Sequence, residues 1–189
     1  MVEQKSMEGC SVKPGAILFV AVLLAVTLGT LTTVDAAAKI TTPEGFVGNN
    51  APGLTLKTID GKQLGLKDSP GYVHVLYFWT VACPPCRTVA PVMDSIHKSL
   101  GPMGVRVIGV NPADTAESIK RYAQTNGYSF FQVADTSGAV ARALKVYATP
   151  TLVVIDRRGV VREAKVGVVG GSSWDGDFRD LVKKLAEER

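Results

Sequence analysis

The motif Cys83-Pro84-Pro85-Cys86 constrains this chain more than any other feature, because of where it falls. It follows residues 73–79, a run so apolar and so rich in β-prone side chains that we expect a central strand covered on both faces. From Cys86 the apolar residues recur at helical spacing as far as Leu100, where Gly101 and Pro102 end the pattern. The two cysteines are therefore expected where a buried strand ends and a helix begins.

This placement predicts a chemistry for the cysteines. Amide N–H groups in the first turn of a helix have no helical partners and lie at the positive end of the helix dipole, so we expect them to stabilise a thiolate at Cys83. Pro84 and Pro85 lack an N–H, and their fixed φ suits the first helical positions, so they shape a rigid loop. Cys86, one turn on and facing the core, is placed to resolve a mixed disulfide formed by Cys83. The motif predicts a two-thiol exchange site.

Two other interpretations of a Cys-x-x-Cys pair are less favoured here. A structural zinc site needs four ligands, and the chain has no second cysteine pair, while His74 falls in a predicted strand and His97 in a predicted helix. A purely structural disulfide that closes so short a loop constrains the unfolded chain little. We therefore predict no metal at this site.

The N-terminal 38 residues form a separate piece. Residues 1–15 are polar and include Lys5 and Lys13, residues 16–26 are an unbroken apolar run, and small residues follow at 36–38. This order is typical of an export signal, and the apolar stretch is also long enough for a retained membrane anchor. Either interpretation sends the rest of the chain across a membrane. We expect residues 39–50 to be a linker and residues 51–189 to be the exported domain.

Composition excludes several classes of protein. Of the 189 residues, 46% are apolar and 20% are charged, which suits one globular domain. The net charge of +4 is spread without a basic run, so we expect no nucleic-acid partner.

The order of the predicted elements indicates an α/β fold. Residues 51–58 and 63–66 predict a hairpin around Asp60-Gly61. Strand and helix patterns then alternate, which predicts a mixed central sheet with helices on both sides. After the first strand and helix, the expected strands are 105–110, 130–133, 151–155 and 160–168, and the expected helices are 115–126, a short one capped by Ser137 and ending at Leu144, and a last one through Trp174, Phe178, Leu181, Val182 and Leu185.

These motifs resemble a known family. The stretch from Cys83 to Pro91, placed after Phe78 and Trp79, resembles the thioredoxin superfamily, and residues 51–56 with 60–62 are similar to its exported, often membrane-tethered branch named after TlpA, ResA and CcmG. The resemblance implies a thioredoxin fold with an N-terminal β-hairpin extension and a central insertion. It implies thiol-disulfide exchange with no cofactor beyond the Cys83–Cys86 disulfide.

The same resemblance implies how substrate is bound. Thr149 and Pro150 would form a cis-proline loop that faces the dithiol, and the backbone of Thr149 would pair with the substrate peptide. Trp79 would form a wall beside the dithiol.

The chain departs from the family pattern at two positions. Ala82 stands where members commonly have a tryptophan, so one aromatic wall of the recognition surface is missing. Tyr77 stands where thioredoxins keep a buried acid, and a phenol with a pKa of about 10 is a poor base at neutral pH. The proton acceptor for Cys86 is then a water or an acid brought close by folding, with Asp114 and Glu117 as the candidates.

The expected function is that of an extracytoplasmic thiol-disulfide oxidoreductase that acts on exported proteins, for example as a reductant of apocytochromes c supplied by a membrane electron donor of the DsbD/CcdA type. A thiol peroxidase is one alternative, because Thr80 and Cys83 have the Thr-x-x-Cys spacing of peroxiredoxins. A copper-binding assembly chaperone of the Sco type is another, although such proteins have three residues between their cysteines and a distant histidine.

Overall fold

The computed structural model describes residues 41–66, 71–167 and 174–188. The described residues all belong to one compact unit, Ile40–Arg189. The predicted export signal or anchor lies outside the described residues. Within the described ranges, no helix combines the length and the apolar character that crossing a membrane requires.

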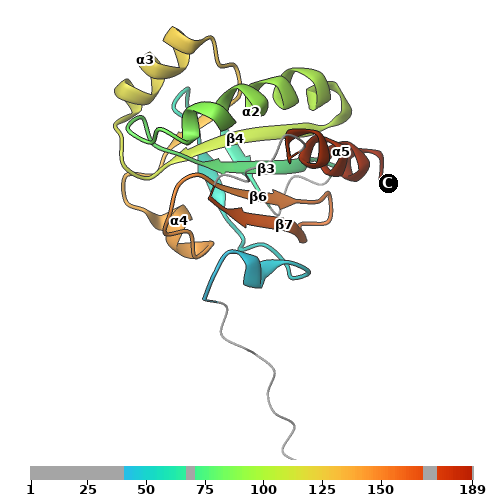
Figure 1. The fold of residues 1–189 in the computed structure, drawn as a ribbon. Helices are drawn as coiled ribbons and strands as arrows, with labels where there is room; N and C mark the ends of the chain where they lie inside the picture. The colour runs from blue at the N-terminus through green and yellow to red at the C-terminus, as the bar shows by residue number, and fades with distance from the viewer. Residues whose placement is uncertain (1–40, 67–70, 168–173, 189) are drawn as a thin grey trace, which may run out of the picture. The chain divides into compact units, whose positions relative to one another are not determined.

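A five-stranded mixed sheet forms the centre of the domain, with the strands in the order β5-β4-β3-β6-β7 (Figure 1). All six residues of the central strand β3 are buried, which confirms the prediction of a strand covered on both faces. Strands β4 and β5 run parallel to their neighbours, whereas β6 and β7 run antiparallel to theirs. The strands are β3 (Val73–Phe78), β4 (Val105–Asn111), β5 (Phe131–Ala134), β6 (Thr151–Ile155) and β7 (Val161–Val166).

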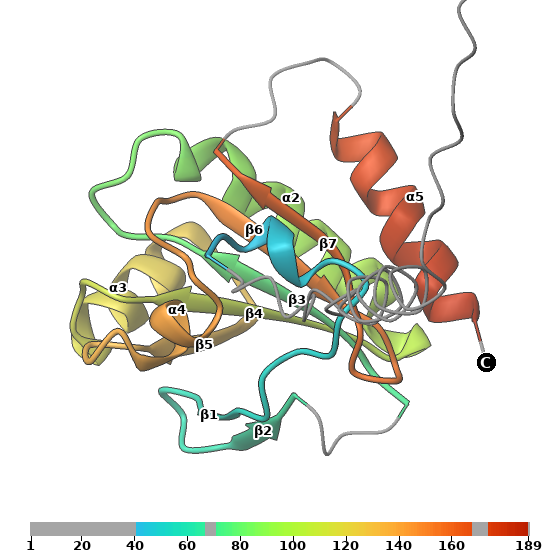
Figure 2. The same ribbon diagram turned by 90° about the horizontal axis from the view of Figure 1, so that it is seen from below.

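Alternation along β3 divides the core into two layers. Val75 and Tyr77 belong to one cluster, whereas Leu76 and Phe78 belong to the other. The first layer is covered by three helices, which are α2 (Cys86–Leu100), α3 (Ala116–Asn126) and α5 (Trp174–Glu187). The second is covered by the short helix α4 (Ala139–Ala143), by the hairpin of β1 (Thr55–Lys57) and β2 (Gln63–Gly65), and by Phe46 of the 3-10 turn η1 (Glu44–Phe46). Figures 1 and 2 show α2 and α5 together on one side of the sheet and α4 on the other.

The predicted N-terminal hairpin is present as a separate two-stranded antiparallel sheet, with Leu56 opposite Leu64. Its strands are shorter than the alternation suggested. Gly61 has a φ of +86° in the connecting turn, a conformation that favours glycine. The turn also reaches the main sheet, because the amide of Ile59 donates to the carbonyl of Gln132 in β5.

Packed structure begins ahead of residue 51, inside the predicted linker. Phe46 is buried, and the amides of Gly48 and Val161 form hydrogen bonds with the carbonyls of Val161 and Asn49 respectively. Residues 48–51 therefore lie beside residues 159–161, at the start of β7.

The capping residues of α3 and α4 are those that the sequence predicted, and Asp135 is a further cap of α4. Thr115 accepts a hydrogen bond from the amide of Ser118 at the start of α3, and Gly127 ends that helix with a φ of +69°. For α4 the hydroxyl of the predicted cap, Ser137, accepts the amide of Ala139. The carboxylate of Asp135 accepts the next two amides, so the two side chains share the capping of this helix.

Candidate active site

The two cysteines lie where the sequence predicted them. Strand β3 ends at Phe78, residues 79–85 form a loop, and α2 begins at Cys86. Cys83 and Cys86 are joined by a disulfide with an S–S distance of 2.09 Å and a Cα–Cα distance of 5.3 Å. The helix start therefore carries an oxidised two-cysteine loop.

The first amides of α2 are directed at this loop. The amide of Cys86 donates to Sγ of Cys83 over 3.3 Å. Pro85 has a φ of −65° at the helix boundary, and both Pro84 and Pro85 are exposed. Cys83 is 8% exposed and Cys86 only 2%. The arrangement favours negative charge on the sulfur of Cys83, which is also the more accessible of the two.

The Thr149–Pro150 segment lies beside the start of this loop. The peptide bond between the two residues is cis, as the resemblance implied. Strand β6 begins at Thr151, which is paired with Phe78, the last residue of β3. The carbonyl of Pro150 accepts the amide of Gly167, which fixes the segment to the end of β7. Thr149 is half-buried and Pro150 is buried.

Tyr77 is bonded to the first residue of α2. Its side chain is fully buried, and its hydroxyl donates to the carbonyl of Cys86 over 2.8 Å. Burial raises the pKa of Tyr77 above its ordinary value, and the nearby Tyr122 and Tyr128 act in the same direction. The phenol is therefore a hydrogen-bond donor at neutral pH and not a base for Cys86.

Trp79 belongs to the core beneath the loop. Its side chain is 2% exposed, its ring is stacked on Tyr77 with centroids 6.3 Å apart, and the ring of Tyr122 lies 5.3 Å away. A direct contact of Trp79 with substrate stays a prediction.

Gly109 in β4 lies against Trp79 beneath the loop, and it is not among the site residues that the sequence predicted. A Cβ at this position would lie 2.8 Å from Nε1 of Trp79 and 2.7 Å from Oε1 of Gln132, so only glycine fits beneath the indole. The available signal was a glycine inside a buried strand, which often marks a close approach.

Folding brings one of the two candidate acids to the loop. Oδ2 of Asp114 accepts the amide of Val81 over 2.8 Å, although 33 positions separate the two residues. Glu117 instead has a side chain that is 81% exposed and forms an ion pair with Arg121 on the outer face of α3.

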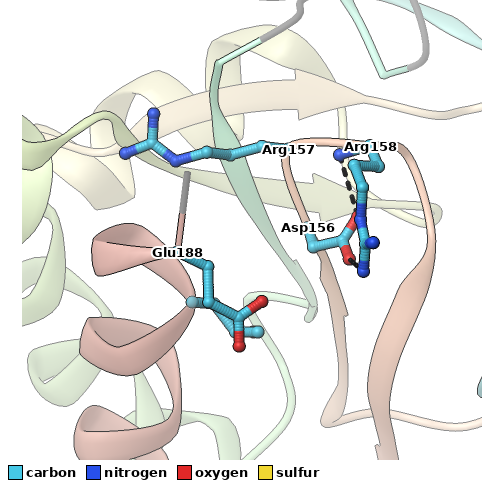
Figure 3. Close-up of a pocket in the computed structure, with 5 residues that line it drawn as sticks. Asp156, Arg157, Arg158 and Glu188 are labelled. Carbon is cyan, nitrogen blue, oxygen red and sulfur yellow. Dashed lines mark hydrogen bonds and ion pairs between the residues drawn. The ribbon is translucent and has the colours of Figure 1, made fainter.

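A cavity lies at the end of the sheet remote from the dithiol loop. Asp156 follows the end of β6, which is antiparallel to β3, so this residue is remote from the dithiol. The volume of this cavity is about 300 Å³. Figure 3 shows the side chain of Arg157 extending away from the pair formed by Asp156 and Arg158. For the described part of the chain, no cluster of three or more His, Cys, Asp or Glu side chains that could hold a metal ion is found.

Comparison with known proteins identifies the family. The model of the AhpC/TSA family matches residues 47–164, which is more than half of the chain. The chain belongs to the AhpC/TSA family. The match spans the dithiol loop and the cis-proline segment, so both lie inside the part that this family shares.

Two curated proteins are similar over most of their length. Thiol-disulfide oxidoreductase ResA of Geobacillus kaustophilus is 30% identical over 123 residues, which are 65% of this chain and 71% of that protein. Thioredoxin-like protein YneN of Bacillus subtilis is 30% identical over 124 residues, which are 65% of this chain and 72% of that protein.

Solved structures give the same result for the fold. MTB DsbF, in its mixed oxidized and reduced forms, matches with a TM-score of 0.60 and 27% identity, over 70% of this chain and 95% of that one. A thiol:disulfide interchange protein of the thioredoxin family from Chlorobium tepidum matches with a TM-score of 0.62 and 27% identity, over 72% of this chain and 95% of that one. This AhpC/TSA family member has the predicted thioredoxin fold and is a thiol-disulfide oxidoreductase of the ResA type.

Proposed function

We propose that this oxidoreductase acts outside the cytoplasm and reduces disulfides in exported proteins, with Cys83 as the attacking thiol and Cys86 as the resolving thiol. The observation that carries the assignment of roles is the amide of Cys86, which donates to Sγ of Cys83. A thiolate at Cys83 would keep this hydrogen bond and would sit at the positive end of α2. Cys86 has no comparable access to solvent.

The reaction consists of two exchanges. The Cys83 thiolate attacks one sulfur of a substrate disulfide, forms a mixed disulfide and displaces the other substrate sulfur as a thiolate that takes up a proton. Cys86, after losing its proton, attacks Sγ of Cys83 and releases the second substrate thiol. Two electrons and two protons pass to the substrate, and the Cys83–Cys86 disulfide forms. A further dithiol must then reduce this disulfide before the next cycle.

Substrate would bind along the cis-proline segment. In this proposal the half-buried Thr149 offers its backbone to an extended peptide, Pro150 shapes the segment, and the exposed rings of Pro84 and Pro85 contact the peptide on the other side of Cys83. Trp79 holds the loop from beneath. The position of Pro150 next to the end of β3 supports this arrangement.

The proposed location and partners rest on the N-terminal sequence and on the family. Residues 1–38 have the order of an export signal or anchor, which would place the domain on the outer side of the cytoplasmic membrane. There the reduced form would be regenerated by a membrane electron donor of the DsbD/CcdA type. Apocytochrome c, whose haem-binding cysteines must be reduced, is the proposed substrate.

Cysteine variants test the roles. Cys83→Ser is expected to abolish reduction of a model protein disulfide, whereas Cys86→Ser is expected to accumulate a mixed disulfide that mass spectrometry identifies at Cys83. Cys10→Ser, which removes the third cysteine of the chain, is the matched control and should retain full turnover. Normal turnover in either active-site variant contradicts the proposed mechanism.

The reduction potential tests the direction. Equilibration with thiol buffers should give a value near that of thioredoxin, about −270 mV, if the protein is a reductant. A value near that of the strong oxidant DsbA, about −120 mV, would instead indicate an enzyme that forms disulfides.

The same preparation tests the two alternatives. Rapid consumption of hydrogen peroxide that requires Cys83 would favour a thiol peroxidase, for which the spacing of Thr80 and Cys83 is the supporting observation. Stoichiometric copper binding that requires both cysteines would favour an assembly chaperone. We expect neither.

A further inference from the structure

The loop that precedes Cys83 is held by a carboxylate from another part of the chain. Oδ2 of Asp114 accepts hydrogen bonds from the amide of Val81 and from Nδ2 of Asn111, both over 2.8 Å. Asn111 is fully buried at the end of β4, and its Oδ1 accepts the amides of Ala113 and Asp114 over 3.0 Å and 2.8 Å. Hydrogen bonds within residues 111–114 therefore fix Asp114, and its side chain is directed at the dithiol loop.

This contact puts a negative charge on the segment that leads to the sulfur proposed to react. One residue, Ala82, lies between Val81 and Cys83, so their Cα atoms are at most about 7 Å apart. The amide of Cys83 also donates to the carbonyl of Thr80, which closes a turn and keeps the segment compact. Of the other groups around the loop, Arg87 in the first turn of α2 is cationic, and Tyr77 beneath the loop is neutral.

We propose that Asp114 is a positioning residue that sets the thiolate fraction of Cys83. Its carboxylate fixes the loop through Val81, and its charge opposes the negative charge that the start of α2 favours on Cys83. A more stable thiolate makes a disulfide more oxidising. The charge of Asp114 therefore limits how far the start of α2 stabilises the reduced form of the dithiol. This inference rests on the proposed role of Cys83 as the attacking thiol.

The test separates the charge of Asp114 from its hydrogen bonds. Both bonds are accepted by a single oxygen, so Asp114→Asn can keep them through its amide oxygen while it removes the charge. Asp114→Ala removes both, and Asp114→Glu keeps the charge. Glu117→Gln is the matched control, because it removes a carboxylate three residues away that has no contact with the loop.

The measurement is the rate of alkylation of Cys83 by iodoacetamide, as a function of pH, in the reduced full-length protein. In Asp114→Asn the pKa of the Cys83 thiol is expected to fall, and the thiolate fraction below that pKa to rise on the order of threefold, the size expected for a charge of this kind near a protein surface. Asp114→Ala should shift in the same direction, whereas Asp114→Glu and Glu117→Gln should follow the wild-type profile.

An unchanged profile in Asp114→Asn overturns the proposal, and so does a shift that appears only in Asp114→Ala, since Asp114 would then act through its hydrogen bonds alone. An equal shift in Glu117→Gln also overturns it, because the effect would not be specific to the contact with the loop. Alkylation needs no substrate. Failure of the wild-type protein to reduce disulfides would therefore contradict the proposed function without altering this result.

Discussion

Tyr77 is a hydrogen-bond donor at a position where an acid would be a base. In the position of the buried acid of thioredoxins, the chain has a phenol that burial keeps protonated and that donates to the carbonyl of Cys86. Tyr77 therefore stabilises the first turn of α2 and takes no proton from the resolving thiol. Asp114, one of the two acids considered as an acceptor for that proton, contacts the loop through the amide of Val81.

Tyr77→Phe should destabilise the oxidised protein by about 1 kcal/mol, the usual net contribution of one buried hydrogen bond. The ring is retained, so the packing against Trp79 and Phe130 is expected to persist. Urea unfolding measures the difference. Tyr147→Phe is the control, because the side chain of Tyr147 is 75% exposed and its hydroxyl should contribute little. Equal losses in both variants would show that the hydrogen bond to Cys86 contributes no more to stability than an exposed hydroxyl does.

The residues of the site were predictable to different degrees. Cys83 and Cys86 follow from local spacing at a strand end, and the Thr149–Pro150 segment follows from the family resemblance. Asp114 was only one of two candidates, since its contact with Val81 depends on how strands distant in sequence are paired. Gly109 was missed for the same reason, because the side chains that would collide with a Cβ come from β5 and from the dithiol loop.

At the scale of elements, Arg157 joins three segments that are far apart in the sequence. Its guanidinium donates to the carbonyls of Gly71 before β3, Met103 after α2 and Ala186 at the end of α5. A cation at the last carbonyls of a helix also interacts favourably with the helix dipole. Arg157 therefore holds α5 against the end of the sheet remote from the dithiol.

Arg157→Met is expected to lower the free energy of unfolding by about 3 kcal/mol, because three hydrogen bonds from a charged donor are lost at once. Arg158→Met is the matched control. Its side chain is 74% exposed and, within the described ranges, forms an ion pair with Asp156 alone, so a loss below about 1 kcal/mol is expected. Chemical denaturation of both variants in the oxidised state measures the two effects. Similar values for the two would contradict the role assigned to Arg157.

Elements were more predictable than their ends and their contacts. The strands 105–110 and 151–155 and the helix at Cys86 appear in the structure nearly as expected, because apolar periodicity reports burial directly. The hairpin strands are shorter than predicted, since pairing ends where the chain turns toward β5. No local sequence pattern identifies Arg157, because its hydrogen bonds go to three segments that are far apart in the sequence.

At the scale of the whole molecule, acid stability depends on carboxylates in α2 and after β6. Burial raises the pKa of Asp94, but hydrogen bonds from Lys98 and Ser129 outweigh it and hold that pKa below its usual value. Asp156 has a lowered pKa for a similar reason, since burial is outweighed by bonds from Val160 and Arg162. A carboxylate with a lowered folded-state pKa stabilises the fold above its unfolded-state pKa, and this stability is lost as the pH falls through the folded-state value.

His74 should make the protein lose stability before these carboxylates titrate. The residue is fully buried in β3, and neither ring nitrogen has a hydrogen-bond partner among the described residues. Burial lowers the pKa of His74 to about 4, and Arg106, opposite it in β4, acts in the same direction. Between the ordinary pKa of about 6.5 and this value, the unfolded chain binds a proton that the folded protein does not. Stability must therefore fall as the pH falls through this window.

His74→Phe removes this proton uptake and keeps a ring of similar shape in the core. For the wild-type protein we expect His74 to account for a loss of about 2 kcal/mol in unfolding free energy between pH 7 and pH 5. The variant should lose correspondingly less, and it should be at least as stable as the wild type at pH 7, because two unpartnered polar atoms leave the core. Urea unfolding of the oxidised proteins at both pH values measures the difference without titration of the two active-site thiols. Parallel losses in the two proteins would mean that His74 is protonated in the folded state as readily as in the unfolded chain.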